Sequence, residues 1–416
     1  MVEADGPLAI ENARIVTCLP TADGGPRRGA AMRELRTIAR GHVLVERGRI
    51  AAVGEGPSIA RAAAMRIDAR GRVVMPAFVD CHTHACWAGE RWDEWERRRA
   101  GAGYLEILQA GGGILSTVRA VRSAPREALA SQLAERLAEM RATGTGAVEV
   151  KTGYGLDAAN ERKMLEAILA VRGVWPAPVV PTLLLGHAVD AENPRQIDDM
   201  CALLDAVAAG VPGGGELAVD AFCEEGAWDV ATCRTLFEKA RRLGMPVRAH
   251  ADQFTARGGL ELALAMGARS VDHLEASTPD GLRALAASRA VGVALPVCGF
   301  AMDGRYADGR ALIDAGGALA VATNWNPGSA PSPSVAFAAA LACRHMKLAP
   351  AEAICAITWN AACVLGLQHE TGAIAPGMRA DLVMLPHRDE RALVYEVAGP
   401  GVDASILGGH AELRVA

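Results

Sequence analysis

The sequence predicts an α/β protein, a (β/α)8 TIM-like barrel with a small composite β-sandwich domain built from both termini. Eight short apolar segments alternate with Ala/Leu-rich helical segments over roughly 300 residues, the pattern of a parallel barrel. The two ends of the chain contain short apolar runs separated by turns, and chain termini often lie close together. A doubly wound sheet is the structural alternative, but no GxGxxG motif follows an early strand to support it.

Each predicted barrel strand is a short apolar run that precedes a helical segment or a turn. The eight strands are predicted at residues 72–80, 146–152, 178–186, 217–223, 246–251, 269–274, 291–297 and 318–323. Several of the helical segments between them end in glycine, a common helix stop. The clearest helical segments are residues 125–144, 160–173, 229–244 and 258–268.

The terminal segments predict a second, smaller unit. Residues 1–75 and 371–416 are expected to form the two parts of one small β-domain, and residues 76–370 the barrel. Short strands are expected within residues 8–19, 42–54 and 62–76 at one end and within 372–386 and 404–416 at the other, with residues 20–41 as an inserted loop.

Composition favours a small-molecule enzyme of the cytoplasm. The 43 basic and 48 acidic residues leave a slightly negative chain without a long basic run, so we expect neither nucleic acid nor a membrane as a partner. The ten cysteines form no CxxC pair, which indicates reduced thiols. Acidic residues occupy the N-terminus where a secretory signal would be basic. The longest uncharged stretch, 315–343, is broken by Asn, Pro, Gly and Ser, unlike a membrane span.

Polar side chains collect at the carboxyl ends of the predicted strands, the end at which barrel active sites form. Five of the ten histidines belong to this set. Its members are His82, His84, Lys151, Tyr154, His187, Glu224, Glu225, His250, His273, Cys298 and Asn324.

The motif "DCHTHACW" predicts a metal site. Residues two apart on an extended strand end point to one side, so His82 and His84 can offer two imidazoles to one divalent ion. A structural pair of satisfied histidines is the alternative for the isolated motif, and His250 at another strand end favours the metal. Three imidazoles suit zinc or ferrous iron. His273 is a further ligand, a partner of a metal-bound water, or a satisfied core histidine.

Several longer motifs carry a family resemblance over essentially the whole chain. The segments "MPAFVDCHTH", "GGGILSTVRA", "VEVKTGYGLD", "LLLGHAV", "HADQF", "VDHLE" and "ATNWNPGS" resemble the amidohydrolase superfamily, and within it the imidazolonepropionase family of histidine degradation. The resemblance implies a homodimeric enzyme with one divalent metal, Zn2+ or Fe2+/Fe3+. It also implies hydrolysis of the ring amide of 4-imidazolone-5-propanoate, a small molecule with a carboxylate tail, to N-formimidoyl-L-glutamate.

The same resemblance assigns roles to individual residues. The resemblance assigns metal ligation to His82, His84, His250 and Asn324. We predict catalytic roles for His273, Asn324 and Gln253. Substrate contacts fall to Arg91, Tyr104, Tyr154, His187, Gln253, Asn326, Gly328 and Ser329. A guanidinium is a forked, permanently charged partner for a carboxylate, which makes Arg91 a suitable anchor. A glutamine at 253 can hydrogen bond to the substrate ring but cannot act as a base. We interpret Lys151 as a site-lining or structural lysine.

Asn324 departs from the family pattern, which has aspartate followed by x-N-P-G. An amide oxygen can ligate a metal but cannot accept a proton at neutral pH, and loss of a general base typically costs a factor of about 100 to 10,000. Strand alternation is expected to turn the neighbouring Asp252 and Asp272 away from the site. Three accounts remain: an inactivating change, a natural homologue with altered activity, or proton transfer by His273.

Two other functions compete with this hydrolase. One is an amidohydrolase or deaminase acting on another heterocycle, because barrel loops vary while the metal face persists. The other is a catalytically weak or inactive ligand-binding protein, which Asn324 alone suggests.

Overall fold

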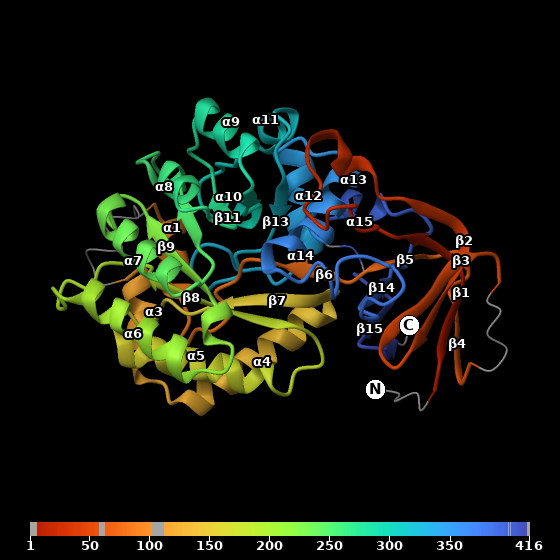
Figure 1. Cartoon of the computed structure of the whole chain (residues 1–416), viewed down its shortest axis with the longest axis horizontal. Coiled ribbons are helices and arrows are strands. Elements are labelled where there is room, and N and C mark those ends of the chain that lie inside the picture. Colours follow the sequence, from red (N-terminus) through yellow and green to blue (C-terminus); the bar gives the residue numbers. More distant parts are fainter. Residues whose placement is uncertain (1–5, 58–62, 102–111, 398, 400, 414–416) are drawn as a thin grey trace.

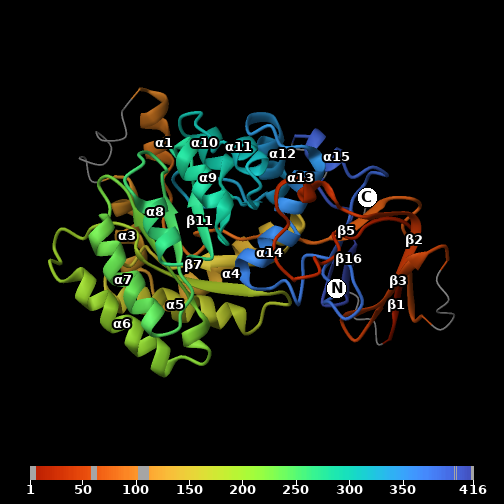
Figure 2. The same cartoon turned by 45° about the horizontal axis from the view of Figure 1, so that its top comes forward.

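The computed structural model describes residues 6–57, 63–101, 112–397, 399 and 401–413. A barrel forms the larger part of the molecule, and a separate sheet containing strands from both ends of the chain lies beside it (Figure 1). A view turned by 45° shows helices around the barrel and the terminal strands to one side (Figure 2).

Eight parallel strands build the barrel in chain order, each paired with the next. They are β6 (Phe78–Asp80), β7 (Thr145–Lys151), β8 (Val179–Gly186), β9 (Ala218–Cys223), β10 (Arg248–Ala251), β11 (Ser270–His273), β12 (Val291–Ala294) and β13 (Leu319–Val321). The residues beyond β6 and β13 close the ring, because Asn324 N–H donates to the His82 carbonyl at 2.9 Å and His84 N–H to the Trp325 carbonyl at 3.0 Å. The predicted (β/α)8 barrel is confirmed.

Helices follow the strands and cover the outside of the barrel. Several begin at side-chain caps, since Asp157, Asp229 and Thr278 each accept a hydrogen bond from the first turn of their helix. The α-helices are α1 (Trp92–Arg99), α3 (Ile114–Ser123), α4 (Arg126–Ala142), α5 (Ala158–Arg172), α6 (Gln196–Gly210), α7 (Val230–Arg242), α8 (Gly259–Ala265), α9 (Pro279–Ala287), α10 (Pro296–Ala301), α11 (Gly309–Asp314), α12 (Val335–His345), α13 (Pro350–Ala356), α14 (Trp359–Leu365) and α15 (Ala392–Tyr395). Short 3-10 helices are η1 (Gly29–Arg33) and η2 (Gly214–Glu216).

The second sheet joins both ends of the chain. Its strands are β1 (Leu8–Val16), β2 (Thr37–Glu46), β3 (Arg49–Glu55), β4 (Met65–Asp68), β5 (Val73–Pro76), β14 (Leu382–Met384), β15 (Ala404–Leu407) and β16 (His410–Leu413). The link between the two ends is the antiparallel pair of β14 with β5. Side chains from both parts, such as Ile10, Val43 and Ile406, share one buried hydrophobic cluster. The expected terminal unit therefore forms one hydrogen-bonded sheet, while the exact domain boundaries stay a prediction.

Two predicted segments differ from the structure. The strand predicted at 72–80 is two strands, because Val73–Pro76 pairs with the terminal sheet whereas Phe78–Asp80 pairs with β7 of the barrel. The loop predicted at 20–41 contains η1 and the first residues of β2. Arg33 of η1 donates to the buried Glu352 of α13 at 2.9 Å, which attaches this segment to the barrel.

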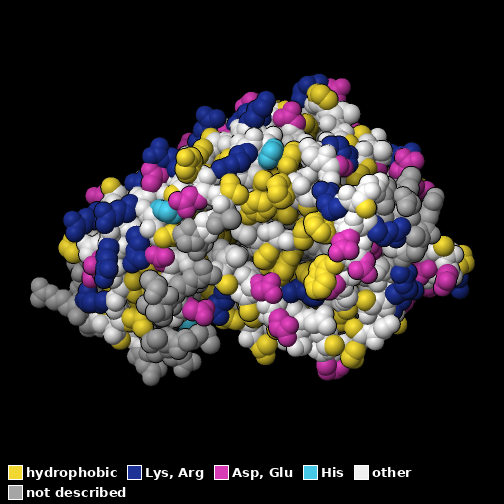
Figure 3. All heavy atoms as spheres, turned by 180° about the vertical axis from the view of Figure 1, so that it is seen from behind, with side chains coloured by type: hydrophobic (Ala, Val, Ile, Leu, Met, Phe, Trp, Pro, Cys, Tyr) yellow, Lys and Arg dark blue, Asp and Glu magenta, His cyan; other side chains and the backbone are white. Residues whose placement is uncertain are grey.

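The surface carries mixed charge. On the face seen in Figure 3, acidic and basic side chains are interspersed around a central group of hydrophobic side chains. Within the described ranges, no helix has both the length and the apolar character needed to cross a membrane.

Candidate metal centre and active site

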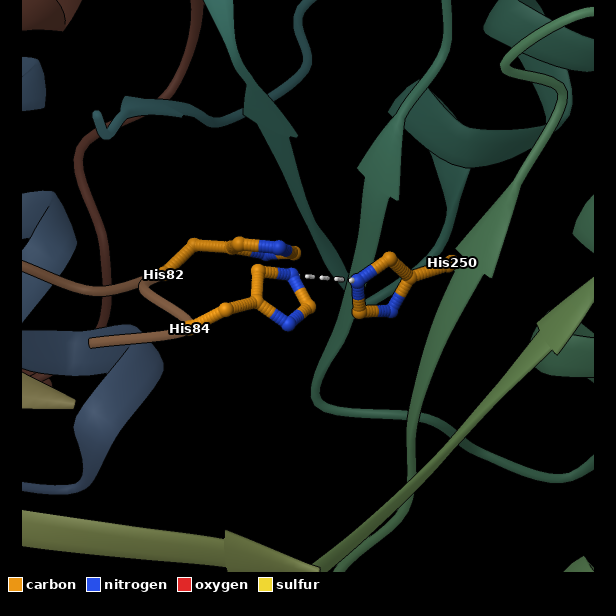
Figure 4. Close-up of side chains that lie close together, drawn as sticks. All are labelled: His82, His84 and His250. Carbon is orange, nitrogen blue, oxygen red and sulfur yellow. Dashed lines mark hydrogen bonds between the residues drawn. The ribbon is translucent and has the colours of Figure 1, made fainter. Parts of the chain in front are cut away.

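Three buried histidines meet inside the barrel at the carboxyl ends of its strands. His82 and His84 lie directly after β6, and His250 lies in β10. One ring nitrogen from each lies within 4.8 Å of those of the other two, and Figure 4 shows the three rings turned toward one another. Nε2 of His84 and Nε2 of His250 are 3.4 Å apart. The two imidazoles of the HxH motif therefore do lie close to the imidazole of His250.

Buried carboxylates orient two of these rings. Nδ1 of His82 lies 2.6 Å from Oδ2 of Asp272, and Nδ1 of His250 lies 3.0 Å from Oδ2 of Asp220. Each carboxylate accepts a hydrogen bond from the Nδ1–H group, which leaves the lone pair on Nε2 of that imidazole. This role of the two aspartates is not predicted from the sequence.

The atoms left without partners match the needs of a cation. Nε2 of His82, Nδ1 of His84 and Oδ1 of Asn324 are buried and make no hydrogen bond with any part of the chain that the structure describes. Buried polar atoms are nearly always satisfied, so unpaired acceptors beside three clustered imidazoles indicate a site that could hold a cation. The donor set of imidazole nitrogens and an amide oxygen fits a divalent metal.

The imidazoles are neutral, as ligation requires. Burial lowers the pKa of His250 to about 4, although the Asp220 carboxylate opposes the shift. Burial likewise lowers the pKa of His82 and that of His84 well below the usual value. No proton therefore competes with a metal for these nitrogens near neutral pH.

An ionic network lies beneath the three histidines. Nζ of Lys151 lies 2.8 Å from Asp220 and 3.0 Å from Glu149, and Nη2 of Arg248 lies 2.6 Å from Asp272. Arg248 also pairs with Glu149, and all five side chains are buried. Three acids against two bases leave one negative charge, which suits a neighbouring cation. Lys151 is therefore part of a buried ionic network, in agreement with a structural role.

Asp272 and His273 both face the site, so the expectation that strand alternation turns Asp272 away is wrong. His273 has φ +87° and Leu274 has φ +75°, conformations that break the alternation at the end of β11. The His273 ring centroid lies 5.4 Å from that of His250. Its Nδ1 lies 3.2 Å from each carboxylate oxygen of Glu275. Asp252 instead accepts a hydrogen bond from Ser277 at 2.7 Å.

Asn324 lies at the seam that closes the barrel. Its backbone is left-handed, with φ +57°, a conformation that asparagine tolerates better than most residues. Its backbone N–H donates to the backbone carbonyl of His82, and its own carbonyl accepts a hydrogen bond from Nδ2 of Asn326 at 2.7 Å. The side chain is 2% exposed. These contacts hold the residue next to the first histidine of the HxH motif.

Two predicted substrate residues lie against the histidine cluster. The His187 ring stacks on His84 with centroids 5.0 Å apart, and the Tyr154 ring lies 5.3 Å from His187. Nδ1 of His187 donates to the Gly153 carbonyl at 2.9 Å, which leaves Nε2 as the acceptor of a neutral ring. Burial lowers the pKa of His187 to about 4, so the ring stays neutral. On another side of the site, Gln253 contacts Cys298.

The loop after β13 is held in shape by one side chain. Oδ1 of Asn326 accepts hydrogen bonds from the backbone N–H groups of Gly328 and Ser329, both at 2.8 Å. Because its Nδ2 bonds to Asn324 and Ser329, the Asn326 side chain serves the loop itself. The guanidinium of Arg91 lies against Gly328 and pairs with Glu94 at 2.7 Å.

Three other predicted positions need comment. Tyr104 lies outside the described residues. Glu224 accepts hydrogen bonds from the backbone N–H groups of Phe254 and Thr255, so it links the loop after β9 to the loop after β10. The exposed Glu225 forms a salt bridge with Arg257. The residues that the sequence analysis overlooked are Glu149, Asp220 and Arg248. Arg248 and Glu149 each lie two positions before a predicted residue, so the strand period could have revealed them.

The chain is similar to known proteins over nearly its whole length. The model described as Amidohydrolase family matches residues 73–410. Imidazolonepropionase of Chloroflexus aggregans is 44% identical, with 95% of this chain and 96% of the relative covered. Imidazolonepropionase of Deinococcus radiodurans is 43% identical, with 95% and 97% covered.

Solved structures share the fold at low identity. An adenosine deaminase of Xanthomonas campestris with bound zinc has a TM-score of 0.73 at 19% identity, covering 98% of this chain and 92% of that one. E. coli guanine deaminase has a TM-score of 0.73 at 14% identity, covering 98% of this chain and 99% of that one.

The barrel and its buried histidines define a metal-dependent hydrolase. The chain belongs to the amidohydrolase family and, within it, to the imidazolonepropionases.

Proposed function

We propose that this chain hydrolyses the ring amide of 4-imidazolone-5-propanoate to N-formimidoyl-L-glutamate, a step of histidine degradation. The observation that carries the proposal is the meeting, at one end of one barrel, of a buried neutral histidine cluster and an arginine-lined loop. The relatives named imidazolonepropionase support the same reaction, and they weigh against a different heterocycle as substrate.

His82, His84, His250 and Asn324 would hold one divalent metal, Zn2+ or iron. Imidazole nitrogens favour these borderline ions over Mg2+ or Ca2+. A bound metal would polarise the ring carbonyl and make water a stronger nucleophile near neutral pH. The chain's own contribution is to keep the imidazoles neutral and oriented through Asp220 and Asp272.

The substrate would lie between the His187 and Tyr154 side and the Gln253 side of the site. Gln253 and Ser329 offer hydrogen bonds to a polar ring, and Tyr154 offers a phenol whose pKa burial raises far above neutrality, so it stays a donor. Arg91, against the backbone at Gly328, would meet the propionate tail. Tyr104 is a further candidate from sequence alone. Asn326 would act by shaping the loop that presents these groups.

His273 is the proposed proton acceptor. Asn324 and Gln253 are amides, which do not take a proton at neutral pH. The Glu275 carboxylate accepts a hydrogen bond from the Nδ1–H group of His273, so the Nε2 lone pair would be available to accept a proton from the attacking water. Because a histidine replaces the usual carboxylate in this account, we expect measurable but reduced turnover.

Restoring the carboxylate tests this account. We expect Asn324→Asp to raise hydrolysis at least about tenfold, because a general base typically contributes a factor of about 100 to 10,000. Turnover is followed by loss of imidazolone absorbance, with metal content matched between proteins. Asn12→Asp is the control, since Asn12 has a similar left-handed backbone, φ +51°, in the terminal sheet. An unchanged or lower rate for Asn324→Asp at equal metal content would show that the amide belongs to a different mechanism.

The same assay addresses the non-catalytic alternative. Ligand binding without turnover, in the original chain and in Asn324→Asp alike, would favour a ligand-binding protein.

We also propose that the protein assembles as a homodimer and is located in the cytoplasm. Light scattering of the purified protein tests for the homodimer.

A further inference from the structure

Helix α1 brings a second arginine to the loop after β13. Arg98 lies in α1, seven residues after Arg91, the residue that precedes the first turn of this helix. Nη2 of Arg98 donates to the Gly328 carbonyl at 2.8 Å. Arg91 approaches the same glycine so closely that a Cβ there would lie 2.1 Å from Nη1. Two guanidinium groups therefore converge on one residue of the loop.

The two arginines differ in how their charge is balanced. Arg91 is paired with Glu94, whose Oε2 accepts from Nε at 2.8 Å and lies 2.7 Å from Nη2. Among the described residues, Arg98 hydrogen bonds only to neutral groups, the Gly328 carbonyl and the Met302 sulfur. Within those residues Glu94 forms its salt bridge with Arg91 and not with Arg98. The group of Arg91, Glu94 and Arg98 therefore has a net charge of one.

Burying a charge in part without a salt bridge has a cost, and a ligand anion would reduce that cost. Arg98 has five N–H donors, of which two bond to residues that the structure describes, so donors remain for an incoming carboxylate. Met302 caps α10, the helix that carries Cys298, and Cys298 contacts Gln253. Arg98 thus lies between the substrate loop and the Gln253 side of the site.

We infer that Arg98 is a second carboxylate-binding residue and supplies the net positive charge that selects substrates with an acidic tail. This inference rests on the proposed function and deepens it, since Arg91 alone is already neutralised by Glu94. The alternative is that Arg98 only fastens α1 to the loop. A fastening role affects every ligand equally, whereas a charge role affects only anionic ligands.

Binding calorimetry on the metal-loaded chain separates the two roles. The probes are 3-(imidazol-4-yl)propanoate and its neutral amide, which differ only in the charge of the tail. The original chain should prefer the propanoate. Arg98→Met should weaken propanoate binding about ten- to a hundredfold, the usual cost of a lost charged hydrogen bond, and leave the amide within about twofold. Retained amide binding also shows that the variant is folded.

Arg99→Met is the matched control, because Arg99 is the exposed neighbour on the same helix, and it should bind both probes as the original chain does. Equal losses for both probes in Arg98→Met, or no loss for either, would overturn the inference and leave the proposed function standing. If the original chain binds neither probe, or binds both equally, the inference fails. Binding of neither would also contradict the proposed function.

Discussion

Asp272 is the residue whose role depends most on local backbone geometry. Its carboxylate accepts from Nδ1 of His82 at 2.6 Å while also receiving Nη2 of Arg248 at 2.6 Å and the Ser270 hydroxyl at 2.6 Å. A carboxylate fixed by three donors holds the His82 ring in one orientation and one tautomer. The strength of metal binding should therefore depend on a residue that contacts no metal.

We expect Asp272→Asn to weaken metal affinity by about ten- to a hundredfold, the range typical of such supporting partners. The asparagine keeps the size of the side chain but removes the charge that faces Arg248 and His82. Competition with a chelator of known affinity measures the change. Asp252→Asn is the control, because Asp252 lies two positions after His250 but its carboxylate accepts a hydrogen bond from Ser277 and not from a histidine. Equal affinities in the two variants would remove Asp272 from the metal site.

The spacing of residues in the sequence predicted the clustered histidines of the site. The position of Asp272 depends on backbone geometry that the spacing does not reveal. His82 and His84 were predictable because two-residue spacing on an extended chain brings side chains to one face. Asp272 was misplaced because nothing in "VDHLE" signals the positive φ of His273 and Leu274. Such a conformation costs energy locally and is stabilised by the surrounding fold, which a sequence pattern does not contain.

The loop after β13 shows how one element positions several groups. Asn326 bonds to two N–H groups of its own loop and to the Asn324 carbonyl, so the loop shape and the position of Asn324 are coupled. Gly328 allows the close approach of Arg91. The function of this glycine is to leave room, since it has no positive φ.

We expect Gly328→Ala to raise KM for imidazolonepropionate about tenfold or more while leaving thermal stability near that of the original chain. The new Cβ would lie 2.1 Å from Nη1 and 2.5 Å from Cζ of Arg91, so the flexible guanidinium must move. Loss of one charged hydrogen bond accounts for the size of the effect. Steady-state kinetics measure it. Gly210→Ala is the control because no atom lies within 4 Å of its added Cβ, and an unchanged KM in Gly328→Ala would contradict the role of Arg91.

Element prediction worked well where periodicity is strong and failed where tertiary pairing decides. Seven of the eight barrel strands fall within the predicted apolar segments, and β7 begins one residue before its segment, because a buried parallel strand is apolar on both faces. The continuous run "RVVMPAFVD" divides between two sheets, and the reason lies in its partners, β14 on one side and β7 on the other. Nothing local in the run distinguishes those partners.

The whole molecule is arranged so that the first and last barrel strands meet at the candidate metal site. His82 and Asn324, 242 positions apart by their residue numbers, are joined by a backbone hydrogen bond of 2.9 Å at the closure of the barrel. A metal held by His82, His84, His250 and Asn324 would link three strand ends across that closure. Its binding should therefore stabilise the barrel as a unit.

We expect removal of the metal to lower the melting temperature by at least about 5 °C, and added zinc to restore it, because a tightly bound ligand adds about 3 to 4 kcal/mol to the native state. Scanning calorimetry with and without a chelator measures the shift. The shift should disappear in His82→Ala and persist in His42→Ala, a histidine of the terminal sheet. Equal melting temperatures with and without the chelator in the original chain would argue against the metal centre.

The most direct test of the account combines metal analysis with an absorbance assay on imidazolonepropionate in the same preparation. The account predicts about one equivalent of zinc or iron per chain, as expected for three imidazoles and one further ligand. It also predicts slow turnover that is lost with a chelator and regained with metal. A chain without bound metal, or a metal-loaded chain that binds the substrate without any turnover, would contradict it.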